Sequence, residues 1–125
     1  IKALVSLTKG EGYGLPILEA AAAGLPVIAT NWSGHLEFLQ HIKFIGVDYS
    51  LAQIHPSRVD NKIFMPGSRW AEPSESDFKK KIMKFRSSNS IPKSWADEGM
   101  KLILEKYSFS EIARQYDELL GKFLK

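Results

Sequence analysis

The stretch from residue 10 to residue 30 constrains the fold of this chain more than any other part; it reads GEGYGLPILEAAAAGLPVIAT. A short apolar run precedes it at residues 3–7, and a second one closes it at residues 27–30. Both runs are typical of buried parallel strands. Between them, closely spaced glycines indicate a tight turn, Pro16 suits the first position of a helix, and Gly24 suits its end. The stretch therefore predicts a strand, a glycine loop, a short helix and a second strand.

Such a unit places the glycine loop at the carboxyl edge of a parallel sheet, against a helix N-terminus. Open α/β sheets bind ligands at that edge, and the free N–H groups of a helix N-terminus favour anions. Two carboxylates frame the loop, Glu11 within it and Glu19 in the helix. Because ionised carboxylates only accept hydrogen bonds, they suit the vicinal hydroxyls of a sugar. The stretch predicts a nucleotide-sugar site, and the alternative is an ordinary glycine-rich turn.

Fifteen positions of this stretch follow a known pattern, at residues 11–16, 18–20, 22, 24 and 26–29. They resemble the signature of retaining glycosyltransferases of the GT-B fold (group 1, family 4 type), and the two glutamates match the spacing of that family's E-x7-E motif. The resemblance implies that Glu11 is the catalytic residue beside the donor sugar and that Glu19 binds the ribose of the donor. The other donor-binding residues that it implies are Gly12, Tyr13, Gly14 and Leu15.

The loop that follows the second strand should line the same crevice, because it leaves the sheet at the same edge. Residues 31–34 have loop composition, and residues 35–39 are expected to form a short helix capped by Ser33. The family often has a glycine and then an acidic residue here, although Glu37 also reads as an exposed helical glutamate. His35 has two readings, contact with a phosphate or exposure to solvent, and we expect it to be solvated. The residues with an expected secondary role are Asn31, Ser33, Gly34 and Glu37.

The rest of the chain carries weaker signals. The next parallel strand is expected at residues 44–47. An insertion is expected at residues 48–66, with a short strand at 62–65. A turn is expected at residues 70–73. Helices are expected to start at Ser74, at Pro92 and after Ser108, on the evidence of capping residues and apolar spacing. The apolar stripe of the last helix has two readings, core packing or a contact with an N-terminal domain.

The resemblance also predicts the domain organisation. The chain starts at Ile1, almost inside a strand that matches the fourth strand of a C-terminal Rossmann-like domain. We therefore expect residues 1–125 to be a partial nucleotide-sugar-binding domain, an α/β unit with a parallel sheet and flanking helices. The N-terminal acceptor domain is expected to lie outside these residues, so the fragment alone is expected to be inactive.

Composition narrows the class of function. The chain has no cysteine, so a disulfide scaffold is excluded, and its net charge of +3 is too small to argue for nucleic-acid binding. It lacks Asp-x-Asp, and its histidines have no partners at ligand spacing, so we expect no metal and no cofactor. We expect a cytoplasmic protein, with the inner face of the membrane as a second location reached through the N-terminal domain.

The resemblance implies a retaining hexosyltransferase. By the resemblance, it would transfer a hexose from a UDP- or GDP-sugar to a glycan or a lipid-linked acceptor. Two alternatives stay open: a non-catalytic or degenerate nucleotide-sugar-binding module, and a phosphorylase or glycan synthase on the same fold.

Overall fold

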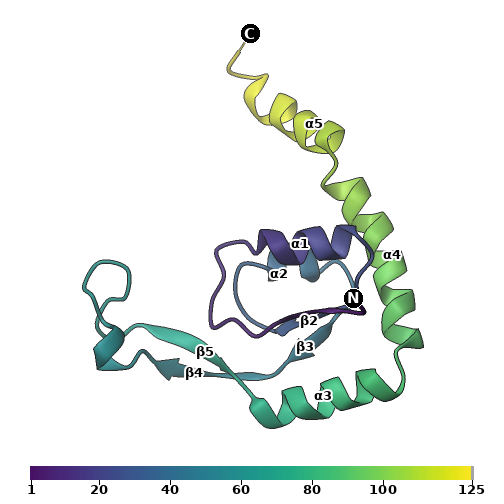
Figure 1. Cartoon of the computed structure of the whole chain (residues 1–125). Helices are drawn as coiled ribbons and strands as arrows, with labels where there is room; N and C mark the ends of the chain where they lie inside the picture. Colours follow the sequence, from purple (N-terminus) through teal and green to yellow (C-terminus); the bar gives the residue numbers. More distant parts are fainter. Residues whose placement is uncertain (125) are drawn as a thin grey trace.

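A parallel sheet forms the centre of the computed structural model, which describes residues 1–124 (Figure 1). Its strands pair in the order β1–β2–β3, with Val5 opposite Ile28 and Ile28 opposite Ile45. The strands are β1 (Leu4–Ser6), β2 (Val27–Thr30) and β3 (Ile45–Val47). Every residue of the central strand β2 is buried, as its unbroken apolar run predicts. The expected α/β fold with a Rossmann-like parallel sheet is confirmed.

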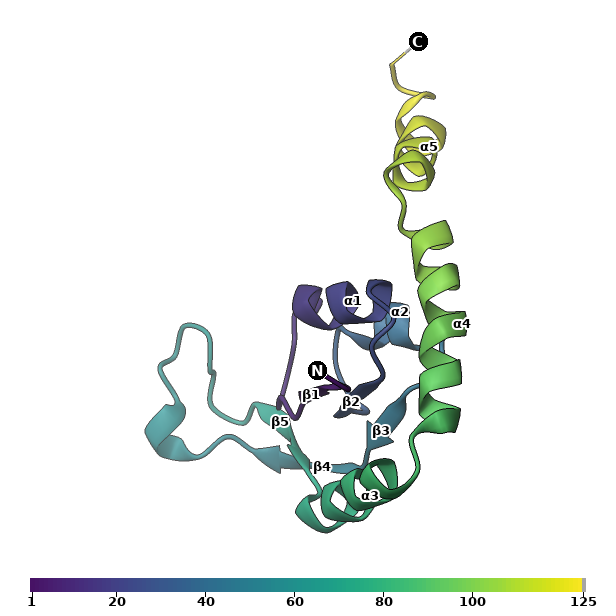
Figure 2. The same cartoon turned by 45° about the vertical axis from the view of Figure 1, so that its right-hand side comes forward.

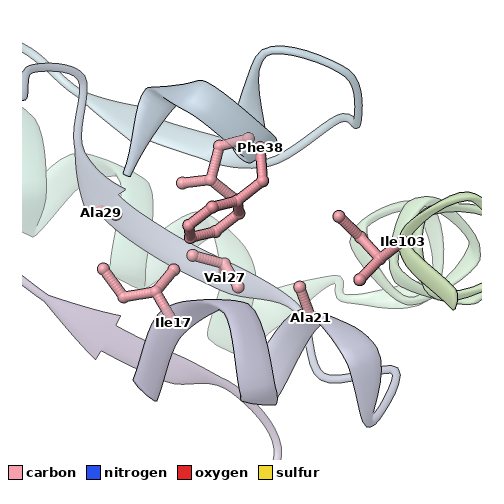
Figure 3. Packing of buried hydrophobic residues seen from close by; sticks show 7 residues of the cluster. Ile17, Ala21, Val27, Ala29, Phe38 and Ile103 are labelled. Carbon is pink, nitrogen blue, oxygen red and sulfur yellow. The ribbon is translucent and has the colours of Figure 1, made fainter. Parts of the chain in front are cut away.

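Helices cover both faces of this sheet (Figures 1 and 2). The helices around the sheet are α1 (Leu15–Ala22), α2 (Leu36–Leu39), α3 (Glu75–Ser87) and α4 (Ser90–Lys106), and α5 (Phe109–Leu120) follows α4 in the chain. On one face, Ile17 of α1, Phe38 of α2 and Ile103 of α4 close over β2 (Figure 3). On the other face, Phe85 of α3 packs against Ile28 and Val47, with Phe78 and Ile82 beside it. The apolar spacing predicted for the helix that starts at Ser74 therefore faces the sheet, as expected.

The free edge of β3 is closed by two side chains of α3. Lys81 Nζ lies 2.5 Å from Gly46 O and 2.7 Å from Asp77 Oδ2, and the Asp48 N–H donates to the same Asp77 oxygen at 2.9 Å. These hydrogen bonds hold the pKa of Asp77 below its usual value, the Asp48 N–H being the larger cause and Lys81 the next. An edge strand that is left unpaired is a template for association with another chain. Here the Asp77 carboxylate binds the Asp48 N–H and the Lys81 ammonium group binds the Gly46 carbonyl, so these edge groups are not available to pair with another strand.

Residues 48–73 form an antiparallel hairpin, which corrects two expectations. Strands β4 (Tyr49–Gln53) and β5 (Arg69–Pro73) pair with each other, and a short 3-10 helix η1 (Pro56–Arg58) lies between them. Residues 70–73 are therefore a strand and not a turn. Residues 62–65 are not a strand, because the amides of 62, 63 and 64 all donate to the Asp60 carboxylate and are unavailable for a ladder.

The C-terminal helices begin close to their expected positions. Ser74 caps α3 by accepting from the Asp77 N–H, and Ser108 caps α5 by accepting from the Glu111 N–H. Helix α4 starts at Ser90, two residues before Pro92. Helix α5 extends away from the sheet (Figure 1), and none of the residues Phe109–Leu120 is buried. Core packing of its apolar stripe, one of the two readings of the sequence, is thus wrong.

Candidate functional site

The glycine loop ends where α1 begins, at the carboxyl edge of the sheet. Gly14 is the N-cap residue with a φ of +85°, and its carbonyl accepts from the Ile17 and Leu18 amides at 3.0 and 3.1 Å. The helix begins at Leu15, one residue earlier than expected, with Pro16 second. Within residues 1–124, four successive N–H groups have no hydrogen-bond partner, those of Gly12, Tyr13, Gly14 and Leu15. The start of α1 therefore offers a row of free donors that favours an anion.

Ser33 fastens the glycine loop to the loop that follows β2. The Glu11 N–H donates to Ser33 Oγ at 2.7 Å, and the Ser33 hydroxyl donates back to Glu11 O at 2.8 Å. Ser33 takes a φ of +93°, which is rare for a residue with a side chain. It does not cap α2 as expected, because its hydroxyl is engaged by Glu11 and the N-cap of α2 is His35. The predicted site residues Glu11 and Ser33 are thus brought together.

Gly34 makes the second link between the two loops. Its N–H donates to Glu11 O at 3.0 Å. A Cβ on Gly34 would lie 2.0 Å from Gly12 O and 2.7 Å from Glu11 O, closer than any side chain tolerates. The backbones of the two loops approach each other so closely that only glycine fits at this position.

The four acidic and amide side chains of the prediction lie at different depths. Glu11 is half-buried, whereas Glu19 on α1 and Glu37 in the first turn of α2 are exposed. Asn31 is exposed, and its N–H donates to Val47 O at 3.0 Å. Among residues 1–124, no hydrogen bond or ion pair engages the carboxylate of Glu11 or of Glu19. Both carboxylates are free to accept hydrogen bonds from a ligand.

Buried polar groups lie at the carboxyl ends of β1 and β2. His35 was expected to be solvated, but it is fully buried, and its Nε2 lies 2.6 Å from Thr30 O. A Cβ at Gly14 would lie 3.0 Å from the Cβ of His35, so the glycine makes room for the imidazole. In the described part of the chain, three buried polar atoms lack a partner: Thr8 Oγ1, Thr30 Oγ1 and His35 Nδ1. Such groups are uncommon in native proteins and often mark a functional site.

The hairpin borders this edge of the sheet. The Ala71 N–H donates to Lys9 O at 3.0 Å, and Lys9 Nζ lies 2.5 Å from Glu72 Oε1 and 4.5 Å from the centre of the Trp70 ring. Lys9 lowers the pKa of Glu72. Trp32, which follows β2, contacts Tyr49 with ring centres 5.2 Å apart and ring planes tilted by 44°. Sequence patterns missed the contact between Lys9 and Glu72, because these residues are 63 positions apart and no local signal links them.

Two further observations concern only the part of the chain that the structure describes. Within residues 1–124, no group of three or more histidine, cysteine or acidic side chains is placed to hold a metal ion. None of the helices in the same range is both long enough and apolar enough to cross a membrane.

Comparisons with known proteins point to the same region. Residues 1–55, which contain the whole glycine loop, α1 and the Ser33–Gly34 loop, match the family model of glycosyl transferases group 1. Over 31 residues the chain is 55% identical to a sucrose synthase from Melioribacter roseus; this segment is 25% of the chain and 4% of that enzyme's length. No solved structure gives a significant match. The N-terminal part of the chain is therefore similar to group 1 glycosyltransferases, and the segment matched in the sucrose synthase is a small part of that enzyme.

Proposed function

We propose that this chain supplies the donor-binding part of a retaining GT-B glycosyltransferase. The reaction would move a hexose from a UDP- or GDP-sugar to a glycan or a lipid-linked acceptor. The observation that carries the proposal is the row of four free amides at the start of α1, flanked by two unengaged carboxylates. The similarity of residues 1–55 to group 1 glycosyltransferases supports it.

Each part of the donor has a matching group in this arrangement. The diphosphate meets the free N–H groups of residues 12–15, where the dipole of α1 adds a positive partial charge. The Glu19 carboxylate accepts hydrogen bonds from the ribose hydroxyls, and Glu11 lies by the donor sugar. As the bond to the sugar breaks, negative charge grows on the diphosphate. Preorganised amides stabilise that charge without moving, and we expect no metal ion or cofactor to take part.

The links between the loops support this role for Glu11. Its main-chain N–H and carbonyl are both held, by the hydroxyl of Ser33 and by the N–H of Gly34. A fixed backbone limits where the carboxylate can reach, which matters because catalytic groups act only in a narrow range of positions. The half-buried position of Glu11 adds to this restriction.

A second candidate is a synthase that joins two sugars from a nucleotide-sugar donor. The match of 31 residues to sucrose synthase favours it. The donor site is the same in both proposals, and the acceptor separates them. Activity assays with free sugars, glycans and lipid-linked glycans as acceptors distinguish the two.

Calorimetric titration of the full chain with UDP-, GDP- and ADP-sugars tests the donor site. We expect one nucleotide class to bind, and Glu19→Ala to weaken it about 10- to 100-fold, because a hydrogen bond to a charged group contributes about 1.5–3 kcal/mol. Glu98→Ala, at an exposed position on α4, is the matched control and should leave the affinity unchanged. Binding of equal strength in the wild type and in Glu19→Ala would contradict the assignment of the ribose site.

A further inference from the structure

The loop between β4 and β5 displays large apolar side chains that nothing in the described chain covers. We call residues 54–69 the hairpin tip; it projects away from the sheet and the helices in both views (Figures 1 and 2). Three consecutive residues at its far end are exposed: Ile63 by 79%, Phe64 by 38% and Met65 by 49%. A contiguous exposed apolar group of this kind on a protruding loop indicates a contact surface.

The hairpin tip has a defined shape. Asp60 Oδ1 accepts from the N–H groups of Lys62, Ile63 and Phe64, each at 2.9 Å. The Phe64 carbonyl accepts in return from the Asp60 and Asn61 amides. The rings of Phe64 and Trp70 pack edge to face, with their centres 6.0 Å apart. The loop is thus held by its own hydrogen bonds, and these present Ile63 and Met65 outward.

The charge of the hairpin tip is positive. Its cations are Arg58, Lys62 and Arg69, and none of them forms an ion pair with another residue in 1–124. The only acidic residue in positions 54–69 is Asp60, so three cations and one carboxylate leave a net charge of +2. That carboxylate is exposed but accepts hydrogen bonds from three backbone amides, which lower the pKa of Asp60. The outward surface therefore combines exposed apolar side chains with unpaired cations.

We propose that the hairpin tip docks on an anionic lipid surface, with Ile63 and Met65 entering the boundary between headgroups and acyl chains. Arg58, Lys62 and Arg69 would then contact the lipid headgroups. A lipid surface is negative at its rim and apolar beneath, and this matches cations that flank exposed apolar residues. The proposal does not depend on the nature of the donor site.

Docking of the hairpin tip has a consequence for the acceptor. The hairpin leaves the sheet at the carboxyl edge and is bonded to Lys9, which directly precedes the glycine loop. A docked tip therefore brings the glycine loop to the same lipid surface. Of the two proposed acceptors this favours the lipid-linked one, a consequence that rests on the proposed function, whereas the docking itself does not.

Sedimentation of the full chain with lipid vesicles tests the proposal without any donor or acceptor. The two vesicle types are phosphatidylcholine alone and phosphatidylcholine mixed with phosphatidylglycerol. One variant, Ile63→Ser/Met65→Ser, removes apolar contacts but keeps Phe64, because Phe64 packs on Trp70. A second variant, Arg58→Glu/Lys62→Glu, reverses charge. The matched controls lie on α3, where Met83→Ser changes an exposed apolar side chain and Lys80→Glu/Lys84→Glu reverses two exposed cations.

We expect the wild type to sediment with the mixed vesicles and to stay in solution with phosphatidylcholine alone. Charge reversal in the hairpin tip should weaken binding at least about 30-fold, since each cation near a charged membrane contributes about fivefold. The serine variant should also weaken it, and both α3 controls should bind like the wild type. The proposal is overturned if the wild type does not sediment, if the tip variants bind normally, or if the α3 charge reversal is equally harmful. Unchanged thermal unfolding of the tip variants would show that they fold.

Discussion

Ser33 and Gly34 determine how the two loops of the candidate site meet. Ser33 takes a backbone conformation that costs energy for any residue with a Cβ, and its hydroxyl makes two hydrogen bonds to the backbone of Glu11. Each such bond contributes about 1 kcal/mol, enough to offset a strain of that order. Strained residues of this kind cluster at functional sites, and this one adjoins the residue to which the family resemblance assigns the catalytic role.

The close contact at Gly34 leads to a prediction about stability and binding together. Gly34→Ala should destabilise the fold by about 1–3 kcal/mol, because the added Cβ overlaps Gly12 O and forces the loops apart. The denaturation midpoint measures this loss, and nucleotide-sugar affinity should fall with it. Gly12→Ala is the control for stability, since a Cβ there meets nothing within 4 Å. Equal midpoints for the two variants would show that the loops do not pack as described.

At the scale of elements, the edge of β3 depends on one ion pair of α3. Lys81→Met removes the ammonium group from Gly46 O and leaves Asp77 without its cation. We expect a loss of about 1 kcal/mol in the free energy of unfolding, a value below that of buried charged hydrogen bonds because Lys81 is partly exposed. We also expect greater self-association, measured by light scattering. Lys80→Met, at an exposed neighbouring position, should show neither effect.

Elements with local signals were predictable from the sequence, and elements set by distant contacts were not. Gly14, Pro16 and Gly24 mark the ends of α1 by their own backbone preferences, and Ser74 and Ser108 mark helix starts by theirs. The hairpin was missed because its position depends on a distant contact with Lys9. The strand expected at 62–65 was wrong because Asp60 binds the amides of residues 62–64, which a strand ladder would need.

In the candidate site, too, local features were predictable from the sequence and distant contacts were not. Local spacing located the glycine loop together with Glu11 and Glu19, but it gave Ser33 the wrong partner and His35 the wrong environment. Both errors have one cause, since the side chains of Ser33 and His35 turn toward the glycine loop more than twenty positions earlier in the chain. The roles of Glu11, Glu19, Asn31 and Glu37 remain predictions.

At the scale of the whole molecule, the sheet with α1–α4 is one packed unit, and α5 and the hairpin tip extend from it (Figure 2). Removing residues 114–125 should therefore change the free energy of unfolding by less than about 1 kcal/mol, since residues 114–120 are all exposed. Ile103→Ala, at a residue of α4 that is 2% exposed, should cost about 2–5 kcal/mol by comparison. A truncation as costly as Ile103→Ala would mean that α5 contributes to the core.

The central claim is that a nucleotide sugar binds at the start of α1 through the four free amides of residues 12–15. Amide hydrogen exchange of the full chain, with and without the nucleotide sugar that binds in calorimetry, tests it most directly. Free amides exchange fast, and hydrogen bonds to a diphosphate slow them. We predict slower exchange at residues 12–15 and no change at the hairpin tip. If the nucleotide sugar binds while exchange at residues 12–15 stays the same, the donor site lies elsewhere and the claim is wrong.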